Sequence, residues 1–507
     1  MKSLFPLFMA IPLGCAFLIT LGTKKLPRVA DILASLATLS LFVLSILIFR
    51  IHGSYKMGDW GGWPPIGINL EIDGFSNIML VVVNLVALAA TLFSIKYMEQ
   101  YTAKYKYYGL FLLMVGGMNG VILTGDLFNL FVFLEIASIA SYALVAFGCE
   151  HEELEASFKY LVLGSIGSTF ILLGVALTYG LTGQLNMEAV TKVLTPEIRS
   201  TFIFILTSTS FIVGFGIKAA LVPFHPWLPD AHPSAPAPIS AMLSGVLIKA
   251  LGIYTIIRVL VNVLGLTPLF GLLLIVLGAL SMIIGALLAA GQWDFKRLLA
   301  YSSISQMGYI ILGIGLGGYL IVTGGSDTAA SLAILGGIFH LGNHAVFKSL
   351  LFLCSGSIEQ ATGTRLLQEM GGLRSKMPLT RTTCTIASLS ISGIPPLNGF
   401  WSKLLIVIAT ILAAFKQPLF FILTAIIILV SFITLTYYLK VLRFAFLGEL
   451  PESLKQIREA PFFMCIPLVI LVILCVGMGI LLIPGIREIA LDPAVNMLKQ
   501  AVQAGLN

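Results

Sequence analysis

Five ionisable residues lie in the middle of long apolar stretches of this sequence, where a charge has no water around it. They are Glu135, Lys218, Lys249, Lys348 and Lys403. On insertion scales, each charge at the centre of a membrane span costs about 2.5–3.5 kcal/mol. One such residue could be accidental, but a set of five favours groups that transfer protons or hold ions inside a membrane.

Two histidines extend this set along one helix. His340, His344 and Lys348 stand at positions i, i+4 and i+8 of the segment HLGNHAVFK, so they share one helical face. An imidazole accepts and releases a proton near neutral pH, and the stripe therefore favours a proton relay. Two histidines four residues apart can also bind zinc, although no third ligand lies nearby in the sequence. A purely structural role is the remaining alternative.

Two of the lysines stand beside proline and glycine residues that should interrupt their helices. Lys218 lies in SFIVGFGIKAALVPFHPWLPDAHP, and Lys403 lies 185 residues later in ISGIPPLNGFWSKLLIV. Proline removes a backbone donor, so both helices are expected to break. Transporters build ion sites from broken helices, because the freed backbone groups must line a cavity or find partners. The repetition suggests two five-helix units, the second inverted relative to the first.

Three more polar residues follow Lys218 in the same proline-rich segment: His225, Asp230 and His232. They either line the point at which protons enter the protein or cap helices, and the sequence leaves both interpretations open. Arg258 stands near the end of an apolar stretch and is expected to reach a membrane interface. All basic residues other than the four buried lysines are assigned to loops and interfaces, where they set orientation.

The elements that must position these residues are membrane helices. Of the 507 residues, 58% are hydrophobic and 10% are charged, whereas a soluble domain carries about 25% charged residues. This composition excludes a soluble enzyme, a nucleic-acid-binding protein and a disordered chain. A span needs about 20 apolar residues, and the sequence predicts fourteen, near 4–22, 29–50, 75–97, 107–124, 127–148, 157–181, 201–222, 236–262, 268–290, 302–323, 328–355, 379–412, 417–446 and 462–484.

The predicted fold is an all-α polytopic membrane protein of about 14 transmembrane helices, with two inverted five-helix repeats in which helices 7 and 12 are broken. We expect helices 1–3 with an external hairpin near 51–74 in residues 1–106, and the first repeat (helices 4–8) in 107–262. The second repeat (helices 9–13) is expected in 263–446, and a connector, helix 14 and a C-terminal tail in 447–507. Lys and Arg concentrate in alternate connections, which favours both termini on the non-cytoplasmic side.

The sequence gives no support for cofactor chemistry. None of the six cysteines belongs to a CxxC pair, and no glycine-rich phosphate-binding loop stands in a usable context. No polar stretch is long enough for a separate soluble domain. We therefore expect no metal site, no bound cofactor, and no catalytic or redox centre of the chain's own.

Five segments resemble the antiporter-like subunits of the complex I superfamily: GDLFNLFVFLEIASIASYALVAF, KAALVPFHPWLPDAHPSAPAPISAMLSGVLIK, FKRLLAYSSISQMGYI, HLGNHAVFKSLLFL and GIPPLNGFWSK. That superfamily includes the N-, M- and L-type chains of NADH:quinone oxidoreductase, the A- and D-type chains of Mrp sodium/proton antiporters, and a subunit of membrane-bound NiFe hydrogenases. The resemblance covers about spans 2 to 14. The segment DLFNLFVFLE looks closer to the Mrp D-type and hydrogenase branch.

The resemblance implies a role for each buried polar residue. Glu135 matches a helix-five glutamate that pairs with a helix-seven lysine, here Lys218. The other matches are a helix-eight lysine, the polar stripe of helix eleven and a helix-twelve lysine or glutamate, here Lys249, His340, His344, Lys348 and Lys403.

The same resemblance implies a function and a setting. We expect a proton-translocating subunit of a multisubunit Na⁺/H⁺ antiporter of Mrp type, in the cytoplasmic membrane. Its partners would be other membrane subunits, lipid, protons and Na⁺, and not nucleic acid. The alternative is a proton- or ion-pumping subunit of a membrane-bound redox complex, either hydrogenase-like or NADH/quinone oxidoreductase-like.

Overall fold

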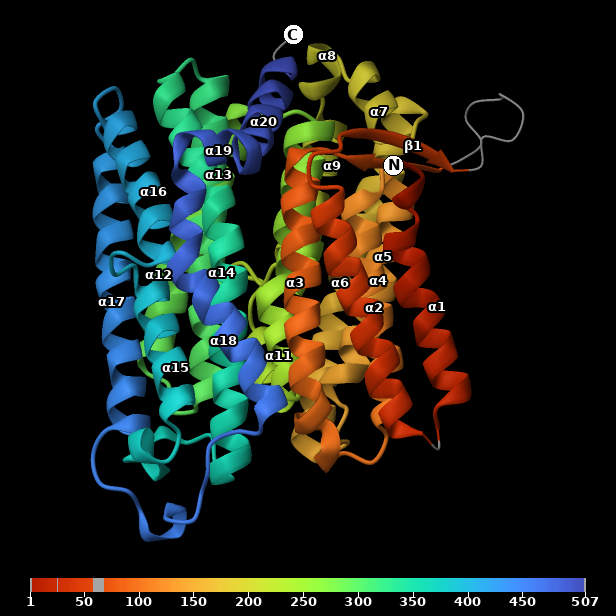
Figure 1. Cartoon of the computed structure of the whole chain (residues 1–507). Coiled ribbons are helices and arrows are strands. Elements are labelled where there is room, and N and C mark those ends of the chain that lie inside the picture. The colour runs from red at the N-terminus through yellow and green to blue at the C-terminus, as the bar shows by residue number, and fades with distance from the viewer. Residues whose placement is uncertain (1, 25, 58–67, 506–507) are drawn as a thin grey trace.

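The computed structural model describes residues 2–24, 26–57 and 68–505. Its helices run side by side in one bundle (Figure 1). Within the described residues, twelve helical segments are long and apolar enough to cross a membrane. Two shorter apolar helices, Phe202–Lys218 and Asn398–Ala414, belong to the segments that were expected to break. Together these elements account for the predicted spans and confirm an all-α polytopic membrane protein.

The helices follow the predicted order along the chain. The first three spans are α1 (Leu7–Gly22), α2 (Pro27–Leu47) and α3 (Gly74–Tyr97). The first five-helix set contains α4 (Lys104–Leu123), α5 (Leu127–Val145), α6 (His151–Thr182), the pair α9 (Phe202–Lys218) and α10 (Leu228–Ser234), and α11 (Ala237–Met242) with its continuation η3 (Leu243–Leu247), η4 (Lys249–Tyr254) and η5 (Ile257–Val263). The second set contains α12 (Pro268–Ala290), α13 (Phe295–Val322), α14 (Asp327–Thr362), the pair α15 (Pro378–Ser392) and α16 (Asn398–Ala414), and α17 (Phe420–Phe446).

The remaining elements complete the ends of the bundle. The last span is α18 (Phe462–Gly477), and the short helices are α7 (Met187–Val193), α8 (Pro196–Arg199), α19 (Pro484–Ala490) and α20 (Asp492–Ala504). Single 3₁₀ turns are η1 (Lys2–Leu4), η2 (Met98–Gln100), η6 (Leu367–Glu369), η7 (Leu373–Ser375), η8 (Glu452–Leu454) and η9 (Met478–Leu482).

The two ends of the bundle differ in what covers them (Figure 1). The chain termini, α7, α8, α19, α20 and a β-hairpin lie at one end, which we call the hairpin end. The hairpin pairs β1 (Gly53–Met57) with β2 (Ile68–Ile72) in antiparallel register, and it confirms the hairpin expected near 51–74. The expected hairpin also included residues 58–67, which lie outside the described residues. The charged connector, residues 447–461, lies at the opposite end, which we call the connector end.

The two five-helix sets are inverted relative to each other. An odd number of spans per set makes the second set start at the end where the first set finishes. Accordingly α4 starts at the connector end, and α12 starts at the hairpin end (Figure 1). The exact limits of the sets remain a prediction.

Both predicted breaks are present, and protein groups satisfy the backbone that they free. The Trp227 side chain donates from Nε1 to the carbonyl of Ile217 in the last turn of α9, at 2.9 Å. The Lys403 ammonium likewise donates to the carbonyl of Ile391 at the end of α15, at 2.9 Å. The lysines differ in position, however, because Lys218 ends the half-helix before its break and Lys403 lies in the half-helix after its break.

The eighth span has an irregular backbone that its sequence does not indicate. After α11 it continues through three π-helical segments, η3, η4 and η5. A π-helical turn carries one residue more than an α-helical turn and occurs mostly at functional sites. Lys249 is the first residue of η4.

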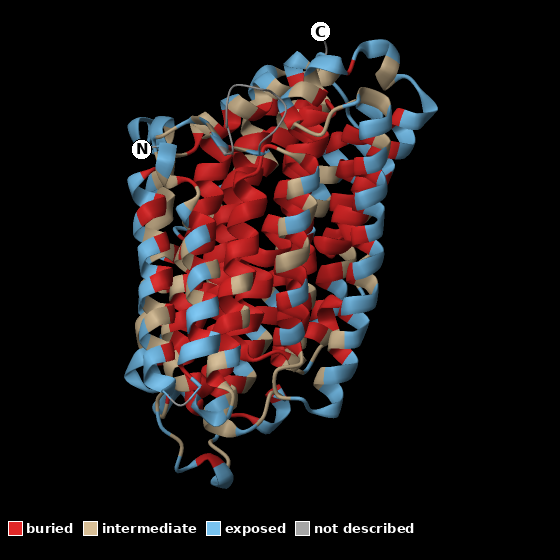
Figure 2. Cartoon of the chain, turned by 90° about the vertical axis from the view of Figure 1, so that its right-hand side faces the viewer, coloured by how far each residue is buried: buried red, intermediate tan, exposed pale blue. Residues whose placement is uncertain are grey.

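Burial follows the pattern of a protein in lipid (Figure 2). Buried residues fill the centre, and exposed residues occupy the outward faces of the outer helices. Many of those exposed side chains are large and apolar, including Phe158, Phe202 and Leu429. Such a surface would be unfavourable in water and is favourable against hydrocarbon. The most enclosed spans are the eighth (Ala237–Val263), α13 and α14, which lie at the centre of the molecule.

Candidate functional site

The first polar group of the predicted relay joins α5, α6 and α9. The Lys218 ammonium lies 3.7 Å from the Glu135 carboxylate. It also donates to the hydroxyl of Ser138 at 3.0 Å and to that of Tyr142 at 3.2 Å. Ser168, on α6, donates to the same Glu135 oxygen. The lysine is buried whereas the Glu135 side chain is 27% exposed, so this pair connects the interior with the outer face of α5.

The second group is Lys249 on the π-helical span. Its side chain is fully buried, and its ammonium donates to the carbonyls of Ser244 and Gly245, each at 2.6 Å. Gly252, nearly one turn further along, touches the backbone of Ala219, and a Cβ built there would lie 2.5 Å from that backbone. The helix of Lys249 therefore packs directly against the residue that follows Lys218.

The third group is the stripe on α14. The two ring nitrogens of His340 share hydrogen bonds with Ser402 (2.9 Å) and Gln306 (3.0 Å). The Lys348 ammonium donates to Tyr438 Oη at 3.2 Å. Among the described residues, neither ring nitrogen of His344 has a hydrogen-bond partner. For the zinc alternative, the described residues hold no group of three or more His, Cys, Asp or Glu side chains that could bind a metal ion.

The fourth group surrounds Lys403. Its ammonium lies 4.6 Å from the centre of the Tyr309 ring, and the neighbouring Ser402 bonds to His340. A cavity of about 310 Å³ opens beside Lys403, between α16 and α17. All of the predicted relay residues except Glu135 are buried, and Ser402 links the stripe on α14 with the helix of Lys403. Their individual roles remain predictions.

The three residues proposed to admit protons lie in different surroundings. Asp230 forms ion pairs with Lys159 (3.1 Å) and Arg297 (2.9 Å), so it joins α6 and α13 at the connector end. His225 is half-buried. His232 is fully buried, and neither of its ring nitrogens has a partner among the described residues. Asp230 is thus held in ion pairs, whereas the ring of His232 is buried and without a bonded partner among the described residues.

Two basic residues were wrongly assigned to loops. Lys296 is buried near the start of α13 and lies 2.7 Å from the carboxylate of Glu359 on α14. Lys104 is buried at the start of α4 and lies 2.7 Å from Asp31. Both lysines stand near helix ends in the sequence, where basic residues usually face water, and packing of distant segments encloses them.

Arg258 does not simply reach an interface. It is bound within the protein at 2.6 Å from Asp73, the residue that caps α3, and it also donates to Tyr254 Oη. Burial alone would raise the pKa of Asp73, but the Arg258 guanidinium and the hydrogen bonds from Ser76 lower it to about 2. Beside the pair is a cavity of about 460 Å³ at the hairpin end, lined by residues that include Glu71, Glu188, Lys192 and Asn262.

The fold and this site define a class of protein: a polytopic membrane subunit with two broken helices and a buried series of lysine, histidine and glutamate side chains. Residues 124–434 match the family described as NADH:quinone oxidoreductase/Mrp antiporter, TM. Residues 63–108 match the NADH-ubiquinone oxidoreductase (complex I), chain 5 N-terminus. The chain belongs to this family, and the resemblance found in the sequence is confirmed.

Individual relatives cover most of the chain. The D-type subunit of a Na⁺/H⁺ antiporter from Alkalihalophilus pseudofirmus is 36% identical over 425 residues, which is 84% of this chain and 82% of the relative. The N-type subunit of NADH-quinone oxidoreductase from Desulforudis audaxviator is 35% identical over 495 residues, 94% of each chain. A chain of the Mrp complex from Dietzia sp. DQ12-45-1b has the same fold, with a TM-score of 0.86, 27% identity, and coverage of 100% of this chain and 99% of that one.

Proposed function

We propose that this chain is the proton-translocating membrane subunit of a multisubunit Na⁺/H⁺ antiporter of Mrp type. The observation that carries the proposal is the series of buried ionisable groups that starts at Lys218, which is paired with Glu135, and runs through Lys249 and the α14 stripe to Lys403. A membrane protein has no structural need for so many buried charges, since each is costly in lipid. The similarity to the D-type antiporter subunit and to the Mrp complex supports the choice of reaction.

The geometry suggests how a proton moves. A carboxylate 3.7 Å away stabilises the ammonium form of Lys218. Separating the pair favours release of that proton toward Lys249, whose helix packs against the residue after Lys218. The proton then passes along the α14 stripe to Lys403, and water fills the gaps between groups. Moving one charge across 100 mV takes about 2.3 kcal/mol, which the gradient of the second ion supplies.

The orientation follows from the distribution of basic residues. Lys and Arg are concentrated in the connections at the connector end, which on the positive-inside rule faces the cytoplasm. Both termini and the β-hairpin then lie on the non-cytoplasmic side of the cytoplasmic membrane. The other membrane subunits of the complex cover part of the apolar outer surface.

The direct test replaces Lys218 with alanine in the assembled complex. Na⁺-dependent proton transport is measured by dye quenching in inverted membrane vesicles, alongside the amount of assembled complex. Lys218→Ala should abolish transport while assembly persists. Lys96→Ala, which removes an exposed lysine from an ion pair with Glu99, should leave transport unchanged. Normal transport in Lys218→Ala would overturn the proposal.

A second candidate is a proton- or ion-pumping subunit of a membrane-bound redox complex. The observation that favours it is the 35% identity to an N-type subunit of NADH-quinone oxidoreductase over 94% of both chains. Purification of the intact complex and identification of its subunits separates the two candidates. Cluster-binding or hydrogenase subunits would favour the redox complex, and small membrane subunits alone would favour the antiporter.

A further inference from the structure

The stripe on α14 continues beyond the three residues that the sequence singled out. From Lys348 toward the connector end, Phe352, Ser355 and Glu359 follow at steps of four, three and four residues. Residues at this spacing lie on one helical face. The face that carries His340 and His344 in the middle of α14 therefore carries a carboxylate near its last turn.

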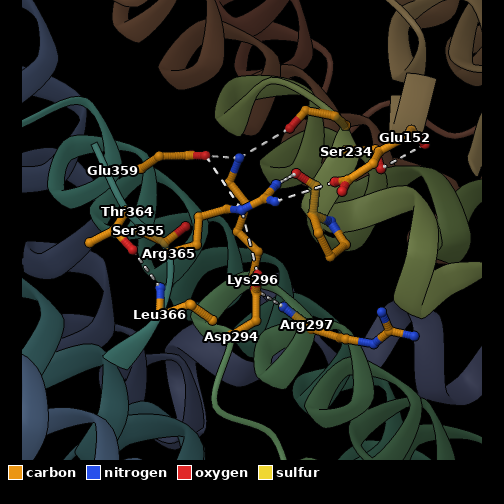
Figure 3. Close-up of polar contacts among 12 residues, drawn as sticks. Glu152, Ser234, Asp294, Lys296, Arg297, Ser355, Glu359, Thr364, Arg365 and Leu366 are labelled. Atoms are coloured by element: carbon orange, nitrogen blue, oxygen red, sulfur yellow. Dashed lines mark hydrogen bonds and ion pairs between the residues drawn. The ribbon is translucent and has the colours of Figure 1, made fainter. Parts of the chain in front are cut away.

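Glu359 is the meeting point of two basic side chains (Figure 3). Lys296 approaches from α13, with its ammonium 2.7 Å from one carboxylate oxygen, and Arg365 lies 3.8 Å from the other. Arg365 also pairs with Asp294 at 3.4 Å and lies 3.9 Å from Glu152. The group thus brings α6, α13, α14 and the segment after α14 together at the connector end.

Exposure falls steadily from the surface into this group. The side chain of Glu152 is 84% exposed, those of Arg365 and Glu359 are 30% and 25% exposed, and that of Lys296 is 3% exposed. A proton from water can therefore reach Glu359, while the amine of Lys296 is enclosed. Such an exposure gradient is what a path from solution into the protein requires.

On its buried side, Lys296 adjoins the short helix α10. Its ammonium donates to the carbonyl of Ala235, the residue that follows α10, at 3.2 Å. The same turn carries His232, and Ser240 donates to the His232 carbonyl at 2.8 Å. Neither ring nitrogen of His232 is bonded within the described part of the chain, so the ring is able to accept a proton.

The ring of Phe352 lies between His232 and Lys348. His232 stacks on Phe352, with ring centroids 4.6 Å apart. The Lys348 ammonium lies 6.0 Å from the centre of that same ring. Lys249 lies near Lys348, because Gly245, whose carbonyl accepts a hydrogen bond from Lys249, packs against the side chain of Ser349, the residue after Lys348. The series Glu359, Lys296, His232 and Lys348 therefore leads from the connector end to the middle of the relay.

We propose that Lys296 and Glu359 form a proton-loading pair that delivers protons from the connector end to His232, and through it to Lys348 and Lys249. The proposal rests on the proposed function. In each step the Lys296 ammonium gives one proton to the His232 ring through water, and becomes a neutral amine. The Glu359 carboxylate then takes one proton from solution and passes it to that amine. Both groups return to their starting charges, and one proton has moved inward.

The alternative is that the pair only fastens α13 to α14. Lys104 provides a matched comparison, because it is also a buried lysine at the connector end, 2.7 Å from a carboxylate. Its ammonium contacts both oxygens of Asp31, at 2.7 Å and 2.9 Å, and donates to the carbonyl of Ile95 at 2.7 Å, so it has three partners where Lys296 has two. Among the described residues, no histidine with unbonded ring nitrogens stands next to Lys104 as His232 stands on the inner side of Lys296. A fastening role and a transfer role can therefore be separated by comparing the two lysines.

The decisive variant is Lys296→Arg in the assembled complex. An arginine keeps the charge and the ion pair but does not release its proton. We expect Na⁺-dependent proton transport in inverted vesicles to fall about a hundredfold, which is typical for loss of a proton-transfer group. The control Lys104→Arg should retain wild-type transport. Wild-type transport in Lys296→Arg would overturn the proposal, since a fastening pair survives that change.

A second pair of variants covers the case in which arginine does not fit the enclosed position. Glu359→Gln keeps the shape of the side chain but cannot take up a proton, whereas Glu359→Asp can. We expect Glu359→Gln to lose transport at every pH from acidic to alkaline, and Glu359→Asp to restore it with a shifted pH profile. Equal transport in both variants would refute the loading role.

Lys218→Ala keeps the two proposals apart. If Lys218→Ala loses transport while Lys296→Arg and Glu359→Gln keep it, the loading pair is refuted and the proposed function stands. If Lys218→Ala itself keeps transport, the proposed function fails.

Discussion

Removing the charge of Glu135 tests the first ion pair of the relay. Glu135→Gln preserves the size of the side chain and its hydrogen bond with Ser168, but leaves the buried Lys218 ammonium without a counter-charge. Its remaining partners are the hydroxyls of Ser138 and Tyr142, which are neutral dipoles. The variant therefore isolates the electrostatic part of the interaction.

The size of the effect follows from the separation of the two charges. At 3.7 Å, two unit charges attract by about 4 kcal/mol with an effective dielectric constant of 20, and by about 1 kcal/mol with that of water. The 27% exposure of Glu135 places the pair between these limits. Since each 1.36 kcal/mol corresponds to a factor of ten, Glu135→Gln should lower transport by roughly fivefold to a thousandfold.

The assay compares variants in the assembled complex. Proton transport is followed in inverted vesicles after an Na⁺ pulse and normalised to the amount of assembled subunit. Glu135→Asp should retain part of the activity, because it keeps the charge at a greater distance. Glu99→Gln breaks an exposed lysine–glutamate pair with a 3.0 Å separation and should have no effect.

One result would refute this reasoning. If Glu135→Gln and Glu99→Gln transport protons equally well in complexes of equal abundance, the charge of Glu135 is not used. The close approach to Lys218 would then be a by-product of packing between α5 and α9.

Three further outcomes follow from single contacts. His344→Phe keeps a ring in the same volume but removes the nitrogens that could carry a proton, and these nitrogens have no hydrogen-bond partner among the described residues. Transport should therefore be lost while assembly stays normal. Retained transport in vesicles would show that His344 is not part of the relay. Gly252→Ala places a Cβ 2.5 Å from the backbone of Ala219 and should displace the segment after α9. Both transport and the melting temperature should fall. An unchanged melting temperature would contradict that contact. Asp73→Asn removes the partner of Arg258. Arg258 and the hydrogen bonds from Ser76 together outweigh burial and lower the pKa of Asp73 from 3.8 to about 2, so the surroundings of this carboxylate contribute about 2 kcal/mol of stability. That contribution is fully present above pH 4 and is lost as the pH falls through 2. The thermal shift of Asp73→Asn should thus be equal at mildly acidic and mildly alkaline pH, and a difference between them would contradict this assignment.

Hydropathy and helix breakers predicted most of the fold. The spans could be located because lipid imposes a single length and composition on them. The breaks beside Lys218 and Lys403 could be located because proline cannot donate a backbone hydrogen bond. The π-helical course of the eighth span could not, since the segment LSGVLIKALGIY reads as an ordinary helix. Its form depends on packing against Ala219 and α14.

The burial of charges near helix ends was the main failure of sequence reasoning. Lys296 lies 63 residues before Glu359 in the chain, and each stands near the end of its own helix. A charged residue near a helix end is normally expected to face water. Lys296 is buried instead because α10 packs against α13. The sequence does contain one indication of this group. His340, His344 and Lys348 are four residues apart, and further steps of four, three and four residues along the same helical face lead through Phe352 and Ser355 to Glu359.

The length of α14 explains how an inlet and a lateral relay can share one helix. At 1.5 Å per residue, the 36 residues of α14 span about 54 Å, and the 15 residues from His344 to Glu359 span about 22 Å. His344 therefore lies near mid-membrane, level with the lateral series, and Glu359 lies near the connector end. A proton that enters at Glu359 travels along α14 before it moves sideways. This geometry separates uptake from lateral transfer, so Lys296→Arg should block uptake from the connector end while leaving the contacts between His340, Ser402 and Lys403 intact.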